Sequence, residues 1–342
     1  MRLLVTGGAG FIGSEFVRQL MSGRLRTELA PDCWNTDPEL QVTVLDSLSY
    51  SGVRENLEDL EGTPGYRFVH GDIRDTALVG EVMDGQEAVV HFAAETHVDR
   101  SIKEAAPFVT TNVLGTHVLL EAARAHRVRR FLHVSTDEVY GSIDEGSWGT
   151  DQPLSPNSPY AASKAASDLL ALSFHRTFGM DVVVTRCSNN YGPRQFPEKV
   201  IPLFVTRLLE GLPVPLYGDG SHVRDWLHVS DHCRGIALAL SRGRAGEVYH
   251  FGGGRELSNL ELAAELVRLT GARPDLIRRV SDRRGHDLRY SLDIGRSRRE
   301  LGYEPRVPFG RGLCDTVSWY RDSRSWWEPL TNRVEECAGA VG

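Results

Sequence analysis

Two groups of polar side chains have the types and the spacing that proton transfer needs. Tyr160 and Lys164 stand four residues apart, so a helix would place the phenol and the ammonium on one face. The positive charge of Lys164 is expected to favour the phenolate of Tyr160 and to make it a general base. Alone, this common pattern also fits a packed tyrosine beside a solvated lysine. The stretch from Tyr160 to Phe174 carries only two charges, Lys164 and Asp168, which indicates a buried helix.

The second group follows a predicted strand and consists of Thr136, Asp137 and Glu138. Thr136 can donate a hydrogen bond to a substrate oxygen that Tyr160 also contacts. Asp137 and Glu138 are neighbouring carboxyls, which can divide acid and base roles when their surroundings separate their pKa values. A solvated acidic turn or a helix cap is the alternative interpretation of this pair.

A glycine-rich turn predicts where a phosphate-bearing ligand binds. Gly7, Gly10 and Gly13 lie between the first predicted strand and the first predicted helix, where free N–H groups and the helix dipole favour a pyrophosphate. Asp46 closes the second predicted strand and is expected to hold an adenosine ribose, although a turn or cap aspartate is the alternative. An acid there repels a 2′-phosphate, which favours NAD over NADP. Asp46 stands further from the glycines than the usual ~20 residues, so we expect an insertion over residues 24–40.

Two more segments at predicted strand ends are expected to line the same groove, because ligands of open α/β sheets bind at the carboxyl ends of the strands. These segments are Gly71-Asp72-Ile73 and Ala93-Ala94-Glu95-Thr96.

The elements that must position these groups alternate between strand and helix in the first half of the chain. Short apolar runs typical of strands occupy residues 3–6, 42–45, 67–69, 88–92, 131–134 and 182–185, and helical stretches occupy 11–20, 108–125 and 160–178. Strands separated by helices of this length predict the α/β class, with a doubly wound parallel sheet of the Rossmann type covered on both faces.

After Arg186 the chain is divided by Pro and Gly, which predicts a smaller, irregular substrate lobe. Short helices are expected there near residues 198–210, 230–240, 258–269 and 310–321. We expect residues 1–186 to form the dinucleotide-binding domain, 187–330 mainly the lobe, and 331–342 a flexible tail. Segments near 230–252 and 309–325 are expected to pack back onto the dinucleotide-binding domain.

Length and composition exclude several classes of protein. A chain of 342 residues exceeds what one hydrophobic core comfortably takes, so two lobes are expected. The formal net charge of −7 gives no basic surface for nucleic acid, and no apolar stretch approaches the length of a membrane span. The N-terminus runs straight into a strand and the five cysteines are scattered without C-x-x-C spacing. A cytoplasmic protein with no disulfide framework and no metal site is therefore expected.

Together these motifs resemble the extended short-chain dehydrogenase/reductases and, among them, the dTDP-glucose 4,6-dehydratases. The resemblance covers the chain from Arg2 to about Leu330. The segments that carry it are Gly7 to Gly13, Ala93 to Ser101, Thr136 to Glu138, Tyr160 to Lys164, Ser188 to Pro193 and Asp282 to Tyr290. The departures are Thr96 where serine is expected, Arg284 where proline is usual, and the insertion before the second strand.

The resemblance implies an NAD-dependent hydro-lyase that converts dTDP-glucose into dTDP-4-keto-6-deoxyglucose. Such an enzyme oxidises C4, eliminates water across C5 and C6, and returns the hydride to C6. By resemblance Tyr160 takes the C4 hydroxyl proton with help from Lys164 and Thr136. Glu138 then removes the C5 proton, and Asp137 protonates the departing C6 hydroxyl.

The resemblance also implies binding residues and an assembly. The expected cofactor-binding residues are Gly7, Gly10, Phe11, Ile12, Gly13, Asp46, Ser47, Leu48, Ser49, Asp72, Ile73, Ala93, Ala94, Glu95, Thr111, Tyr160, Lys164 and Asn190. The expected substrate-binding residues are Thr96, Thr136, Asn189, Lys199, Val200, Leu203, Pro215, Tyr217, Arg224, Asn259, Asp282, His286, Arg289 and Tyr290. The helices over 108–125 and 160–178 carry more apolar surface than one sheet face can cover, and relatives pair such helices, so a homodimer with a four-helix interface is expected.

Other functions compete with this one. The nearest are a 4-epimerase, a decarboxylase, or a 4,6-dehydratase that acts on a UDP sugar, and a more distant alternative is an NAD-binding scaffold that senses redox state. Asp137 and Glu138 argue against an epimerase, which needs no acid for a C6 leaving group. Thr136, Tyr160 and Lys164 together argue against a scaffold. The preference for dTDP rests on the resemblance alone.

Overall fold

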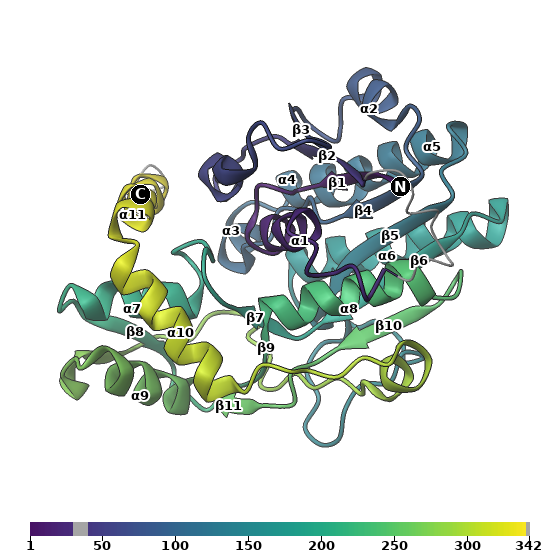
Figure 1. Cartoon of the computed structure of the whole chain (residues 1–342). Helices are drawn as coiled ribbons and strands as arrows, with labels where there is room; N and C mark the ends of the chain where they lie inside the picture. Colours follow the sequence, from purple (N-terminus) through teal and green to yellow (C-terminus); the bar gives the residue numbers. More distant parts are fainter. Residues whose placement is uncertain (30–39, 340–342) are drawn as a thin grey trace.

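Seven short strands rich in Val, Leu and Phe form one parallel sheet in the order β10-β6-β5-β4-β1-β2-β3 (Figure 1). The computed structural model describes residues 1–29 and 40–339, with the backbone alone for 332–339. The strands are β1 (Arg2–Thr6), β2 (Gln41–Asp46), β3 (Tyr66–His70), β4 (Ala88–His91), β5 (Arg130–Thr136), β6 (Val182–Cys187) and β10 (Val248–Phe251). The first six confirm the predicted strands. The strand order reverses between β1 and β4, which is where open parallel sheets bind ligands.

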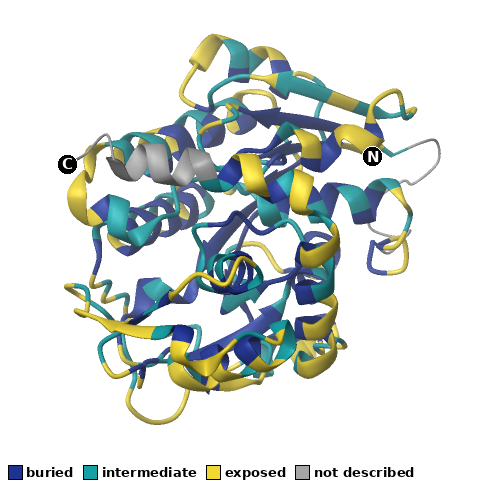
Figure 2. Ribbon diagram, turned by 90° about the vertical axis from the view of Figure 1, so that its left-hand side faces the viewer, coloured by how far each residue is buried: buried dark blue, intermediate teal, exposed yellow. Residues whose placement is uncertain are grey.

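Helices cover both faces of this sheet, because each face presents apolar side chains that must be buried. On one face lie α1 (Phe11–Met21), η1 (Arg54–Leu60) and α8 (Val229–Arg242), and on the other lie α2 (Thr76–Met83), α5 (Thr116–Ala125) and α6 (Pro159–Phe178). The buried central strands and the exposed outer sides of the helices are visible in Figure 2. No helix of the described residues is long and apolar enough to cross a membrane.

The helix predicted over 108–125 is interrupted. The chain there forms α3 (Val98–Lys103), α4 (Ala106–Phe108), the π-helical turn η2 (Val109–Gly115) and α5. Gly115 permits a close approach between this turn and the loop after β3, since a Cβ at Gly115 would lie 2.5 Å from Ile73 Cδ1. The π-helical turn therefore brings the residues at its centre against the cavity at the strand ends.

The second lobe is built from short elements around its own core of buried side chains. Its strands β11 (Glu256–Ser258), β9 (Val223–His228) and β7 (Asn189–Tyr191) form one small sheet, and β12 (Ile277–Val280) pairs with β8 (Val214–Tyr217). Its helices are α7 (Val200–Leu209), α9 (Asn259–Thr270), α10 (Phe309–Asp322) and α11 (Arg324–Gly339), and η4 (Pro274–Leu276) is a short 3-10 turn. The lobe lies below and to the left of the large sheet in Figure 1.

Two of the domain expectations need correction. Helix α8 and strand β10 do return to the large sheet, as expected for 230–252, but α10 packs against α7 and α9, so the segment 309–325 belongs to the second lobe. Residues 331–339 continue helix α11, which contains Pro329 and has no further Pro or Gly before Gly339. Part of the predicted insertion, residues 30–39, and residues 340–342 of the predicted tail lie outside the described residues.

Candidate active site

The glycine-rich turn shapes a phosphate-sized opening between β1 and α1. Gly7 has a φ of +72°, and a Cβ on it would lie 2.5 Å from the backbone nitrogen of Ala93 at the end of β4. A Cβ at Gly13 would overlap the carbonyl oxygen of Gly7. No side chain caps the N-terminus of α1, so its N–H groups face the cavity that Phe11 and Ile12 line. This is the donor arrangement that an anionic ligand needs.

Asp46 closes the other side of this opening, at the end of β2. Its Oδ2 accepts a hydrogen bond from Ala9 N at 2.9 Å, and its Oδ1 accepts one from Leu48 N at 2.8 Å. Burial raises the pKa of Asp46, while these two backbone donors oppose the rise. The carboxylate is thereby fixed in place at the rim, with lone pairs left to accept ribose hydroxyls.

One cavity of about 340 Å³ joins this opening to the predicted catalytic residues. Every residue predicted to bind the cofactor lines it except Leu48, whose contribution is the backbone donor to Asp46. All five predicted catalytic residues line it as well. Sequence positions from 7 to 199 therefore meet in one space, because the carboxyl ends of parallel strands lie at one edge of the sheet.

Tyr160 and Lys164 lie on the buried face of α6. The Thr136 side chain lies close enough to the Tyr160 phenol to oppose a rise in its pKa, and Lys164 Nζ donates to Val134 O at 2.8 Å. Burial and the nearby Glu138 hold the pKa of Tyr160 well above its usual range, and burial lowers the pKa of Lys164 to about 8. Lys164 was expected to lower the pKa of Tyr160. In the protein without a cofactor, the loss of water around the phenolate outweighs that effect.

Asp137 and Glu138 start the 3-10 turn η3 (Asp137–Tyr140) and have different surroundings. Burial, followed by the charge of Glu138, holds the pKa of Asp137 well above its usual range. Burial also raises the pKa of Glu138, but Arg283, Lys199 and other cations oppose that rise. Two neighbouring carboxyls with different surroundings can supply the acid and the base that an elimination requires.

A buried ion pair between α6 and β6 was not predicted from the sequence. Asp168, one turn after Lys164, is fully buried, and Arg186 Nε of β6 donates to its Oδ2 at 2.8 Å. Arg186 also donates to the hydroxyl of Tyr140, which is 2.7 Å from His250 Nε2 on β10. Asp168 is visible in the sequence as one of two charges in an apolar helix, but its partner is not.

Three other cavity or cavity-supporting residues were missed. Asn112, in η2, donates to Glu95 O at 3.0 Å and to Ser163 Oγ at 2.8 Å, and so ties the loop after β4 to α6. Glu198 and Cys187 line the cavity itself. Glu198 directly precedes Lys199, which was predicted to bind substrate. This position next to Lys199 was the one signal in the sequence that Glu198 lies at the cavity.

The predicted substrate-binding residues divide into two sets. Thr96, Asn189 and Lys199 line the cavity together with Thr136. The others lie beyond it in the second lobe: Val200, Leu203, Pro215, Tyr217, Arg224, Asn259, Asp282, His286, Arg289 and Tyr290. Arg224 is buried over the Tyr290 ring at 4.3 Å and donates to Asp287 O at 2.8 Å. The guanidinium of Arg289 is paired with Glu256 at 2.7 Å, so it faces a carboxylate in this structure.

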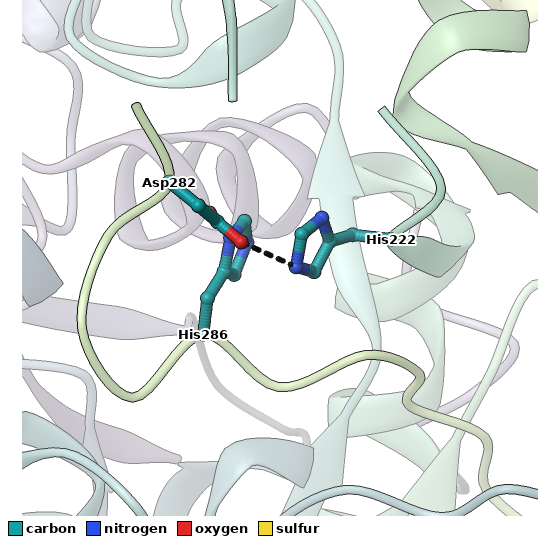
Figure 3. A group of neighbouring side chains, drawn as sticks. All are labelled: His222, Asp282 and His286. Atoms are coloured by element: carbon teal, nitrogen blue, oxygen red, sulfur yellow. Dashed lines mark hydrogen bonds and ion pairs between the residues drawn. The ribbon is translucent and has the colours of Figure 1, made fainter. Parts of the chain in front are cut away.

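His222, Asp282 and His286 form a cluster in the second lobe (Figure 3). His286 Nδ1 lies 2.7 Å from Asp282 Oδ1, and His222 Nε2 lies 3.2 Å from Oδ2. The two imidazole rings are stacked, with centroids 3.6 Å apart and planes 14° apart. A metal bound to both rings would have to lie in both ring planes, and nearly parallel planes do not meet between the rings. Two imidazole N–H donors that share one carboxylate account for this geometry.

Fold and cavity together define an enzyme of the short-chain dehydrogenase/reductase type, with a Tyr-Lys pair and an added pair of carboxyls. A family model described as GDP-mannose 4,6 dehydratase matches residues 4–316. A dTDP-glucose 4,6-dehydratase from Streptomyces niveus is 60% identical over 100% of this chain and 99% of that protein. Another from Actinoplanes sp. is 62% identical over 96% of this chain and 100% of that protein.

A solved structure of DesIV, the dTDP-glucose 4,6-dehydratase from Streptomyces venezuelae with NAD and TYD bound, is 61% identical. It covers 96% of this chain and 100% of its own, with a TM-score of 0.92. The chain belongs to the dTDP-glucose 4,6-dehydratase family.

The buried ion pair predicts a defined dependence of stability on pH. Burial alone would raise the pKa of Asp168, but Arg186, His133 and Lys164 lower it to about 2. Because this pKa is below the unfolded value of about 3.9, the stabilisation is present above pH ~4 and is lost as the pH falls towards 2. Asp168→Asn should lower the free energy of unfolding at pH 7 by about 3–5 kcal/mol.

Urea unfolding followed by circular dichroism at pH 7 and pH 3 measures this effect. The matched control is Asp151→Asn, since Asp151 has a side chain 89% exposed and a loose ion pair with Arg296. The control should change stability by less than about 1 kcal/mol. Equal stability of Asp168→Asn and wild type at pH 7 would contradict the role of the pair.

Proposed function

We propose that this protein binds NAD and dehydrates dTDP-glucose to dTDP-4-keto-6-deoxyglucose, with Asp137, Glu138 and Tyr160 as the proton-transferring groups. The observation that carries the proposal is the meeting of the buried Asp137 and Tyr160 and the half-buried Glu138 in one cavity with the glycine-rich opening. The relatives that share 60% or more of the sequence over nearly the whole chain are named for this reaction.

The cavity fits NAD in its shape and in its donors. The uncapped N-terminus of α1 beside Gly7 suits the pyrophosphate, and the fixed carboxylate of Asp46 suits the ribose. The carboxylate also disfavours a 2′-phosphate. NAD, when bound, takes a hydride from C4 of the sugar and returns it to C6. Its positive ring also opposes the high pKa that burial gives to Tyr160.

Tyr160, Thr136 and Lys164 act at C4. Tyr160 removes the proton of the C4 hydroxyl, while Thr136, which lines the same cavity, holds the sugar oxygen. Lys164 is held by Val134 O, and its charge stabilises the phenolate that Tyr160 must form. The ketone that results at C4 makes the C5 hydrogen acidic.

Glu138 and Asp137 act at C5 and C6. Glu138, whose negative charge is supported by Arg283, Lys199 and Arg224, removes the C5 proton and later returns it. Burial and Glu138 raise the pKa of Asp137 well above its usual range, which favours the protonated form, and Asp137 gives its proton to the departing C6 hydroxyl. An epimerase or a decarboxylase has no use for this acid.

The second lobe is the proposed nucleotide site. Lys199 and Asn189 are placed to contact the sugar diphosphate at the cavity, with Arg224, Asn259 and His286 further out and Pro215 and Tyr217 beside the base. In this proposal Arg289 leaves Glu256 to reach a phosphate. We infer dTDP rather than UDP from the names of the relatives. We also propose the cytoplasm as the place of action.

The proposed homodimer uses an apolar face outside the cavity. Val109 and Leu114 on η2 and Leu169 and Phe178 on α6 are each between 50% and 55% exposed, and η2 packs against α6. Two neighbouring helical segments with apolar outer faces favour a four-helix contact between two copies.

The reaction itself is tested with dTDP-glucose in deuterated water, followed by mass spectrometry and NMR. The product should have lost one water and should carry one deuterium at C5, because Glu138 exchanges its proton with solvent before it reprotonates C5. Added reductant should be unnecessary. Unchanged hexose, or a hexose epimerised at C4, would reject the proposed function. Parallel incubation with UDP-glucose measures the base preference.

Glu138→Gln should preserve NAD binding and reduce formation of the 4-keto product by at least about 100-fold, since a general base contributes 10² or more. The rate is measured by the absorbance of the 4-keto sugar in alkali, and bound NAD by its absorbance after denaturation. Glu145→Gln is the matched control, because Glu145 lies exposed on a loop outside the cavity. If Glu138→Gln keeps the wild-type rate, the role given to Glu138 is wrong.

Light scattering at micromolar concentration should give twice the mass of one chain. Leu169→Glu should yield the mass of one chain, because it places a charge in the proposed apolar contact. Leu260→Glu, at a position 43% exposed on α9, is the control and should leave the mass unchanged. A wild-type mass of one chain would reject the dimer.

A further inference from the structure

The segment from Gln195 to Lys199, which we call the strap, connects β7 to α7 and forms one wall of the cavity. Gln195, Phe196, Glu198 and Lys199 line the cavity together with the glycine-rich turn and the ends of the large sheet. The strap comes from the second lobe, whereas the opposite wall comes from the first. A ligand bound in the cavity therefore lies between the two lobes.

Glu198 joins the strap to both loops that border the cofactor opening. The hydroxyl of Tyr50, in the loop after β2, donates a hydrogen bond to Glu198 Oε1. His97 Nε2, at the end of the loop after β4, lies 3.5 Å from Glu198 Oε2. The side chain of Glu198 is only 5% exposed. One buried carboxylate therefore connects the strap to Tyr50, 148 residues earlier in the sequence (198 − 50), and to His97, 101 residues earlier (198 − 97).

Tyr50 and His97 both direct a donor hydrogen toward Glu198, whose carboxylate also lies 3.8 Å from Lys199 Nζ. His97 Nδ1 accepts from Arg100 N at 3.3 Å, which leaves the hydrogen of the neutral ring on Nε2, facing Glu198. Burial, followed by nearby cations, lowers the pKa of His97 to about 3, so the ring stays neutral. Burial and Glu198 raise the pKa of Tyr50, so the phenol keeps its hydrogen.

Other contacts fix the strap at its two ends. Lys199 Nζ donates to Thr96 O at 2.9 Å, and the Tyr320 hydroxyl donates to Gln195 O. The ring of Phe196 meets the ring of Tyr50 edge-on at 5.5 Å. Phe196 also packs in a buried cluster with Val53 and Leu330.

We propose that Tyr50, His97 and Glu198 hold the strap closed over the cofactor, so that reduced NAD cannot leave between its formation and the return of its hydride. This inference rests on the proposed function. It adds that Tyr50 and His97, which do not line the cavity, are retention residues that act through Glu198.

The reaction explains why retention matters. A dehydrogenase that uses its cofactor as a co-substrate must release it in every turnover. Here the hydride taken from C4 is needed again at C6, so escape of NADH would leave a keto sugar that cannot be completed and an enzyme without oxidant. An enzyme that leaks would therefore lose activity as it turns over.

The test compares Tyr50→Phe, His97→Asn and wild type, each loaded with NAD and then given excess dTDP-glucose without free NAD. Tyr50→Phe removes only the hydroxyl that reaches Glu198. His97→Asn keeps a side chain able to cap α3 but too short for Glu198. Tyr50→Phe should release the cofactor about tenfold faster or more, as expected for a lost hydrogen bond to a charged group. His97→Asn should also release it faster than wild type, because the 3.5 Å contact with Glu198 is lost.

The expected signs of the leak are NADH in the ultrafiltrate during turnover, a progressive loss of activity, and recovery when NAD is added. Tyr66→Phe is the matched control, since the Tyr66 hydroxyl is buried without a hydrogen-bond partner on β3, away from the strap. Wild type and this control should keep their activity. If Tyr50→Phe does not fold, His97→Asn still tests the proposal.

Two results would overturn the proposal: retention of NAD(H) by both variants at the wild-type rate, or inactivation that added NAD does not reverse. Failure of the proposed function itself is a different result. If the proposed function is wrong, wild type forms no 4-keto product at all. If only the retention proposal is wrong, wild type is active and the variants release no more NADH than wild type.

Discussion

The catalytic geometry depends on the buried ion pair between Asp168 and Arg186. Asp168 belongs to α6, which carries Tyr160 and Lys164, and Arg186 belongs to β6. Arg186 also holds Tyr140, which ends the turn that begins with the two catalytic carboxyls. A buried charge is tolerated only where its partner and its hydrogen bonds are in place, so the pair fixes Tyr160 on α6 relative to the turn that begins with Asp137 and Glu138.

Elements with a strong local pattern could be predicted from the sequence. The first six strands and α6 occur where the apolar runs place them, and the glycines, Asp46 and the five residues predicted to be catalytic line one cavity. Their chemistry is visible because each motif is contiguous and lies at a strand end. Strand order alone then brings the motifs together.

The missed features all depend on partners far away in the sequence. The role of Glu198 cannot be predicted from the sequence, because its partner Tyr50 is far away along the chain. Arg186 resembles an ordinary surface arginine in the sequence, because only the structure shows Asp168 buried beside it. The high pKa of Tyr160 was missed for a related reason. Spacing on a helix shows that Lys164 is near, but it does not show how little water reaches the phenol.

The path of the chain limits how this enzyme can be divided. After β6 the chain enters the second lobe, returns to the large sheet as α8 and β10, enters the lobe again as β11 and α9, and touches β10 once more where Ser297 Oγ donates to His250 O at 2.6 Å. It then ends in the lobe as α10 and α11. No single cut separates the two lobes, so recombination at one point cannot exchange the proposed nucleotide site and keep the cofactor site. Sugar recognition and hydride chemistry are inherited together.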